Sequence, residues 1–162
     1  MDARIELIAK LADDEFDGEC FNGPSLMGTL RKLSATMAAY DDTFEGYSAW
    51  EIALHCAYYK YFLAKALGAS LGEYPYEKEN WGFGAAPPPG DEASWAALLE
   101  YLPMVHRAAW AAARSAPPSK LDEIFPEWKV SYAKALSWLA THDTFHGAQI
   151  RSMGTPGFKS PK

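Results

Sequence analysis

Apolar residues recur every three or four positions along most of the chain, which is the period of an amphipathic helix. Segments rich in glycine and proline separate the periodic stretches. The pattern predicts helices over residues 2–15, 24–40, 48–67, 92–115 and 127–153. Pro24 and Pro126 suit the first turns of two of these helices, and Asp91 suits the N-cap of a third. Because no strand pattern competes, the sequence predicts an all-α helical bundle.

Histidines interrupt the apolar seams of two predicted helices. In the last helix the seam runs through Trp128, Tyr132, Ala135, Leu139, His142, His146, Gln149 and Met153. In the middle helix it runs through Ile52, His55, Tyr59, Phe62 and Ala66. Residues at such spacings face the interior of a bundle, so His55, His142 and His146 are predicted to point inward.

Three inward histidines predict a metal site. His142 and His146 are four residues apart, so both imidazoles project from one face of a helix and can reach one ion. That spacing is common by chance, but burying imidazoles in an apolar seam costs free energy unless their nitrogens find partners. With His55 from a second helix, three nitrogen donors would hold a divalent transition metal and leave a coordination position vacant.

The string from His142 to His146 invites comparison with the HExxH metallopeptidases, in which a glutamate inside the pair is the general base. Here the acid is Asp143, which has a shorter reach. Residues 147–162 contain no His, Asp or Glu to serve as a downstream ligand. The third ligand must therefore come from upstream, which again favours His55.

Three segments together resemble the DinB/YfiT-like superfamily: Gly23-Pro24-Ser25-Leu26, the run from Ser48 to His55, and the run from His142 to Ile150. The similarity spans most of the chain. It implies an up-down-down-up four-helix bundle, here with an extra short N-terminal helix or helical extension. It also implies that His55, His142 and His146 take the metal-ligand positions, and it implies metal-dependent hydrolysis, or transfer and isomerisation reactions that use a small thiol.

The leading hypothesis is a metal-dependent hydrolase that acts on a small-molecule substrate through metal-activated water. A thiol-cofactor-dependent S-transferase or isomerase is the alternative among enzymes, because an open site can also bind a low-molecular-weight thiol as thiolate. A non-catalytic stress-response or binding protein with a structural metal is the alternative outside enzymes. Imidazole ligands suit several first-row ions; zinc or nickel is the leading expectation, and iron and manganese stay open as alternatives.

Three side chains are candidates for catalytic roles. Glu51 lies one turn before His55, and Asp143 adjoins His142, so either could orient a ligand or accept a proton. Solvated carboxylates on helix flanks are the commoner case. The period leaves open whether His106 lines the metal pocket as acid, base or fourth ligand, or lies beside it as an ordinary hydrogen-bonded histidine.

Four further residues are candidates for contact with the substrate. Gln149 follows the histidines on their seam, and Arg151 could attract an anion or simply complement the helix dipole. Tyr59 shares the seam of His55. Trp81 belongs to an unusually long connection rich in aromatic residues, which could close over the bundle as a lid or cover its core.

Composition limits the classes of binding partner and the cellular setting that we expect. The formal charge of −6 and the pI near 5.2 argue against nucleic-acid binding, and no apolar stretch predicts a membrane span or a secretory signal. Two widely spaced cysteines favour a reducing, cytoplasmic setting. We expect one bundle domain over residues 1–153 and a flexible C-terminal tail over 154–162. A homodimer through an exposed bundle face is compatible with the pattern.

Overall fold

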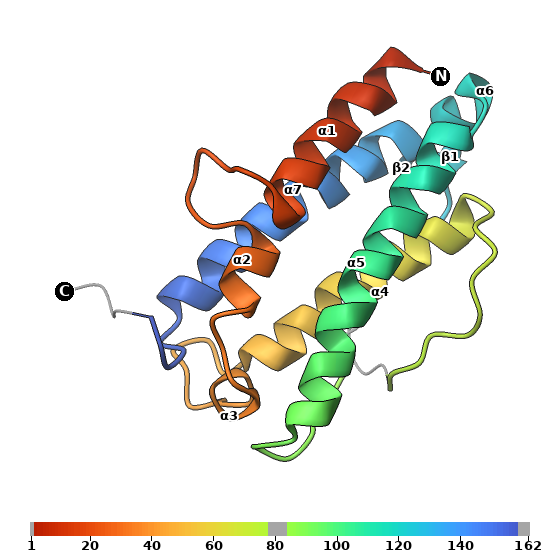
Figure 1. Ribbon diagram of the computed structural model, residues 1–162. Coiled ribbons are helices and arrows are strands. Elements are labelled where there is room, and N and C mark those ends of the chain that lie inside the picture. Colours follow the sequence, from red (N-terminus) through yellow and green to blue (C-terminus); the bar gives the residue numbers. More distant parts are fainter. Residues whose placement is uncertain (1, 78–83, 159–162) are drawn as a thin grey trace.

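The computed structural model describes residues 2–77 and 84–158. The long helices in these ranges are α1 (Ala3–Asp17), α4 (Ala49–Ala66), α5 (Glu92–Ser115) and α7 (Tyr132–Ser152). They lie side by side, with α4 against α5 and α7, and α1 against α7 and α5 (Figure 1). The fold is mostly helical, which confirms the predicted all-α class. Within the described ranges, no helix has both the length and the apolar character that a bilayer crossing requires.

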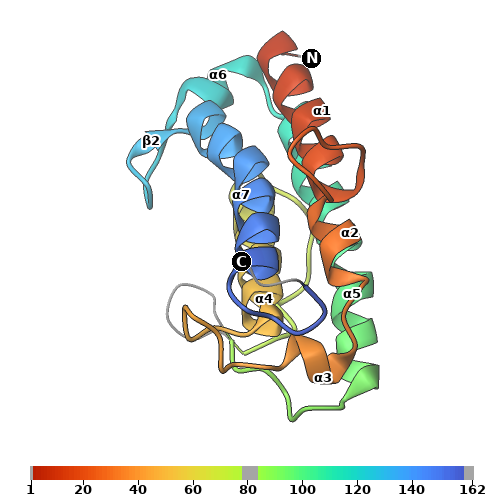
Figure 2. The ribbon, with the colours of Figure 1, turned by 90° about the vertical axis from the view of Figure 1, so that its left-hand side faces the viewer.

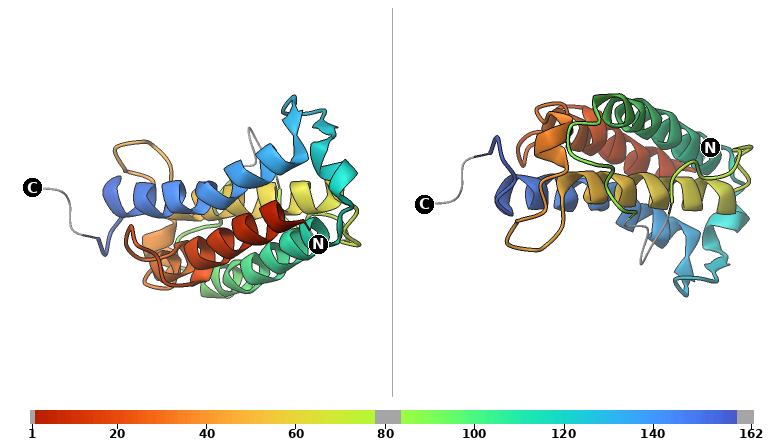
Figure 3. Two further views of the ribbon diagram at one scale, coloured as in Figure 1. Left: turned by 90° about the horizontal axis from the view of Figure 1, so that it is seen from above. Right: turned by 90° about the horizontal axis from the view of Figure 1, so that it is seen from below.

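Short elements occupy the two ends of the long helices. They are α2 (Leu26–Leu30), α3 (Ala35–Ala38), α6 (Pro118–Asp122), β1 (Ile124–Phe125) and β2 (Val130–Ser131). Figure 2 shows α3 at one end of the molecule and α6 with β2 at the other. The two strands form an antiparallel pair that stands out from the helices beside the start of α7 (Figure 3).

The predicted helices over 48–67 and 92–115 match α4 and α5 closely, because both begin at strong caps. Ser48 and Glu51 form a reciprocal capping box at the start of α4. Asp91 caps α5 by accepting a hydrogen bond from the backbone N–H of Ser94, at 3.0 Å. Gly68, with φ of +88°, ends α4 in the left-handed conformation that glycine adopts readily.

The single helix predicted over 24–40 is wrong, because tertiary hydrogen bonds interrupt it. The indole N–H of Trp95 donates to the carbonyl of Leu33, and the N–H of Ala35 donates to Glu92. These backbone groups would otherwise have partners within a continuous helix. Ser34 then caps α3, so the segment forms two short helices. Pro24 precedes the N-cap of α2 and does not lie in its first turn.

The predicted start of the last helix at residue 127 is also wrong. Lys129 has φ of +55°, a left-handed conformation that cannot continue a right-handed helix. It closes the turn between β1 and β2, in which Phe125 pairs with Val130, and Pro126 lies in that turn. Ser131 caps α7 by accepting from the N–H of Lys134.

The stretch after α7 contacts the body of the molecule as far as it is described. Thr155 is buried, and Phe158 packs against the core. The backbone N–H of Phe44 donates to the carbonyl of Met153, at 2.8 Å. The last four residues, 159–162, lie outside the described ranges.

A layer of buried polar side chains divides the apolar core. One apolar cluster gathers the first halves of α4 and α5 with the end of α7, and the other gathers the second halves of α4 and α5 with the first half of α7. Between them lie buried polar residues from all four long helices: Glu15, His55, Lys60, His106, Asp143 and His146. The fold therefore brings its buried charges and imidazoles to the same level of the bundle.

The centre of this polar layer is an ion pair between Lys60 of α4 and Asp143 of α7. The two side chains are 0% and 1% exposed, and the ammonium contacts the carboxylate directly. The Lys60 ammonium also lies 5.2 Å from the ring centroid of Phe16 on α1. Because either charge would be costly to bury alone, the pair fixes the position of α4 relative to α7.

We expect Lys60→Met to destabilise the protein by about 3–5 kcal/mol, because it leaves the buried Asp143 carboxylate without its cation. Urea unfolding followed by circular dichroism measures this loss. Lys10→Met, at an exposed position of α1, is the matched control and should change stability by less than about 0.5 kcal/mol. The double variant Lys60→Met, Asp143→Leu should recover most of the loss. If Lys60→Met alone were as stable as the control, the pair would not hold the layer together.

Candidate metal centre

The three seam histidines converge in the structure. His55 Nε2 lies 3.0 Å from His142 Nε2, and His146 Nε2 lies 3.1 Å from the same atom. His55 and His146 are 7% and 6% exposed, and His142 is half-buried. The three ligand atoms all lie within 4.8 Å of one another, so they form a group that could hold a metal ion. One helix positions His55, and the four-residue spacing on α7 places the other two on one face.

The spacing of these nitrogens fits a single ion. Two imidazole nitrogens bound to one tetrahedral ion at 2.0–2.1 Å lie roughly 3.3–3.4 Å apart. The observed separations of 3.0 and 3.1 Å differ from that value by a few tenths of an ångström. The donor set is purely imidazole, which suits zinc, nickel, copper and iron better than calcium or magnesium.

A hydrogen-bonded chain fixes the orientation of His146. Its Nδ1 lies 2.7 Å from Gln149 Oε1, and Gln149 Nε2 donates to the carboxylate of Glu45. Because the carboxylate only accepts, the amide nitrogen must face Glu45 and the amide oxygen must face the ring. The proton of His146 therefore resides on Nδ1. Its Nε2 carries the lone pair toward the other histidines, which is the form that binds a metal.

Burial favours the uncharged form of His142 and of His146. Desolvation lowers the pKa of His146 to about 4, although its bond to Gln149 opposes this. The pKa of His142 falls well below its ordinary value, first because of burial and then because of the neighbouring His146 and His55. Neutral imidazoles are the metal-binding form, so no proton has to leave these two rings at neutral pH.

A second group of potential ligands lies beside His142. A ligand atom of His142, the Asp143 carboxylate and the Cys56 thiol lie within 4.8 Å of one another. Lys60 already neutralises Asp143. Burial raises the pKa of the Asp143 carboxyl and that of the Cys56 thiol. The Nδ1 atom of His142 is buried without a hydrogen-bond partner among the described residues, so this side of the ring is the less satisfied one.

The three catalytic candidates occupy different places. Asp143 is beside His142 but belongs to the ion pair described above. Glu51 accepts hydrogen bonds from the N–H and hydroxyl of Ser48, at 2.6 and 2.7 Å, so its carboxylate serves the cap of α4. His106 contacts α1, where its Nε2 lies 2.9 Å from Asp13 and its ring stacks on Phe16 at 4.0 Å. His106 is not part of the histidine group.

The substrate-contact candidates are also dispersed. Tyr59 lies beside the cluster, with its ring 4.7 Å from that of His55. Gln149 accepts a hydrogen bond from Nδ1 of His146, on the side of the ring away from the other histidines. Arg151 donates to the carbonyl of Pro24 and to the hydroxyl of Thr29, so it joins α7 to the start of α2. Trp81 lies outside the described residues.

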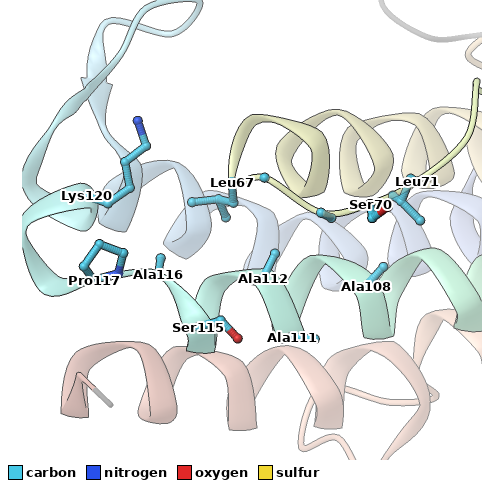
Figure 4. Close-up of a pocket in the computed structure, with 12 residues that line it drawn as sticks. Leu67, Ser70, Leu71, Ala108, Ala111, Ala112, Ser115, Ala116, Pro117 and Lys120 are labelled. Atoms are coloured by element: carbon cyan, nitrogen blue, oxygen red, sulfur yellow. The ribbon is translucent and has the colours of Figure 1, made fainter.

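Two hollows differ in their relation to the histidines. One, of about 280 Å³, is lined by His55, Tyr59, Trp128, Trp138, Leu139 and His142. The other, of about 460 Å³, lies between the end of α4 and the second half of α5. Figure 4 shows that small and aliphatic residues form most of the walls of this second hollow, with Lys120 as the charged side chain among them. It contains none of the predicted site residues, whereas the hollow beside the histidines is lined by two of the candidate ligands.

Sequence reasoning missed Lys60, Glu45 and Trp138. Lys60 lies off the seam of α4 and therefore resembles a solvated residue, although aromatic residues flank it on both sides. Glu45 lies in the loop before α4, and only the folded chain brings it to Gln149. Trp138 faces the hollow from a position outside the predicted seam.

Comparison with known proteins agrees with the resemblance of the motifs. No curated protein and no solved structure matches the chain significantly. The DinB superfamily matches residues 5–150, which include most or all of each long helix and the three histidines. This match covers most of the 162 residues, and the chain therefore belongs to the DinB superfamily.

Proposed function

We propose that His55, His142 and His146 bind one divalent transition metal, zinc or nickel, and that the protein is a metal-dependent hydrolase of a small molecule. The observation that carries this proposal is the convergence of three imidazole nitrogens, two of which belong to the residues His55 and His142 that line a hollow. A site with three protein ligands and an accessible side is more typical of catalytic than of structural metals. The four long helices would form an up-down-down-up bundle over residues 1–153, and their directions in Figure 1 support this.

The chain's own groups would divide the remaining work. A bound divalent ion supplies Lewis acidity and lowers the pKa of water. Gln149 and Glu45 hold His146 in the metal-binding tautomer. Burial raises the pKa of Tyr59, so its hydroxyl keeps its proton at neutral pH. That hydroxyl could donate a hydrogen bond to the oxygen on which negative charge develops in the substrate.

One observation favours a thiol-dependent transferase as the second candidate. None of the described side chains that line the hollow is a carboxylate. Hydrolysis benefits from a general base near the attacking water, whereas a thiol bound as thiolate is already a nucleophile. A low-molecular-weight thiol would then be the cofactor that enters the hollow.

We expect about one metal ion per wild-type chain when the protein is purified without a histidine tag. Elemental analysis should show that His55→Ala and His142→Ala lose the ion, because each removes one of three donors. His106→Ala is the matched control. It also removes a buried histidine, but this histidine belongs to α5 and contacts α1, away from the cluster. A wild type that takes up neither zinc nor nickel would refute the metal site.

Turnover separates the candidate activities. The zinc-loaded or nickel-loaded wild type should hydrolyse a small neutral aryl ester such as p-nitrophenyl acetate, and His142→Ala should lose this rate while His106→Ala keeps it. For the transferase, a small thiol should instead change the visible spectrum of the cobalt-substituted protein and be consumed with an electrophile. Full metal content, loss of melting temperature on chelation and no turnover in either assay would indicate a structural metal.

Gln149→Ala should weaken metal affinity by about 10–100-fold, because His146 loses the acceptor that fixes its tautomer. Competition with a chromogenic chelator measures the dissociation constant. Glu45→Gln should cost less, since its amide oxygen can still accept from Gln149. Ser152→Ala, on an exposed position of the same helix, is the control and should leave affinity unchanged. Equal affinity in Gln149→Ala and Ser152→Ala would show that this hydrogen-bonded chain does not support the ligand.

A further inference from the structure

The hollow beside the histidines has aromatic and aliphatic walls. Beyond His55 and His142, its lining consists of Tyr59, Trp128, Trp138 and Leu139, none of which is charged. At about 280 Å³ it has room for roughly nine water molecules of about 30 Å³ each. Water against such walls makes few hydrogen bonds, so an apolar group that displaces it binds favourably.

The aromatic walls are held by contacts with the candidate ligands and with one another. The ring of Tyr59 lies edge-on to His55 at 4.7 Å and to His142 at 5.5 Å. Trp128 lies 5.7 Å from Tyr59 and 6.2 Å from Trp138. Flat rings thus surround the space next to the imidazoles, and a flat ring is the shape that packs well against them.

The hairpin of β1 and β2 presents Trp128 to this space. Phe125 is buried and packs edge-on against Trp128 at 5.2 Å, which anchors the hairpin to the core. The turn places Lys129 at φ of +55°, a conformation that costs a residue with a side chain free energy. This conformation closes the turn between the paired residues Phe125 and Val130, and the same turn carries Trp128.

Trp138 leaves a large apolar surface open. It is 46% exposed although it belongs to the wall of a hollow. The ammonium of Lys134 lies 5.4 Å from its ring centroid, so a cation–π contact holds the indole in place. An exposed indole at a concave site next to potential metal ligands offers a surface for a ligand to cover.

From these observations we propose the substrate class: a small molecule in which a flat apolar ring is joined directly to a metal-binding group. The ring occupies the space between Tyr59, Trp128 and Trp138, while the polar group faces His55 and His142. This inference rests on the proposed metal site. It adds that the part of the substrate next to the reacting group carries no charge, since the walls described above offer none to pair with it.

Binding of two hydroxamates to the zinc-loaded protein tests the proposal without any turnover. Acetohydroxamate carries the metal-binding group alone, and benzohydroxamate adds the ring. Isothermal titration calorimetry should show that benzohydroxamate binds at least tenfold tighter. Trp128→Ala and Trp138→Ala should reduce this ratio to about threefold or less while they keep the metal and the affinity for acetohydroxamate. Leu11→Ala, which removes an apolar side chain on α1 about as exposed as Trp138, is the control and should keep the ratio.

Each outcome decides one of the two proposals. Zinc-loaded protein that binds both hydroxamates equally, or binds neither, would overturn the substrate class and leave the metal site standing. Protein that takes up no zinc would overturn the metal site, and the inference with it. Should Trp138→Ala fail to fold, cyclohexanehydroxamate decides with the wild type alone, because a flat space between rings should favour the phenyl group over the puckered one by severalfold.

Discussion

The ion pair of Lys60 and Asp143 fixes the relative position of α4 and α7, and the candidate metal centre depends on that position. A buried ammonium without a partner is so costly that the two helices cannot slide by one turn, about 5.4 Å, without separating the charges. Lys60 lies five residues after His55, and Asp143 follows His142 directly. The register that joins the ions therefore also sets His55 against His142. The ion pair of Lys60 and Asp143 and the proximity of His55 to His142 therefore depend on the same relative position of the two helices.

Burial of the polar layer as a whole costs folding free energy. Well-packed hydrophobic residues would fill the same space at equal or lower free energy, as replacements of buried ion pairs in other proteins indicate. The layer also separates the core into two apolar clusters that could have been continuous. Lys60 and Asp143 pair inside the layer, whereas at its edge the Nε2 atoms of His55 and His146 both lie close to that of His142, beside a hollow. Three imidazole nitrogens directed at one another are better explained by binding of an ion than by folding alone.

The sequence predicted the parts of the site that follow from local spacing, and it failed where distant residues decide. His142 and His146 follow from helical periodicity, and the capping box of Ser48 explains why α4 was placed well. The segment 24–40 looked helical because its apolar period is helical, but bonds from α5 to the backbone around Ser34 override that preference. Glu45 could not have been found, because its hydrogen bond with Gln149 joins residues that are far apart in the sequence.

Charge accounts for the coexistence of a metal centre and a buried ammonium. A divalent ion near Lys60 would be repelled in a medium of low polarity, where Coulomb interactions extend over many ångströms. Burial is the main cause of the low pKa of His142 and of His146, and Lys60 lowers both further, which is the same repulsion acting on a proton. Asp143 offsets it by direct contact, and Glu15, which acts on the Asp143 carboxyl, adds a second negative charge from α1. His142 and His146 can therefore remain neutral donors for the proposed metal, while the compensating charge comes from Asp143 and α1 and not from the hollow, whose walls stay apolar as the proposed substrate requires.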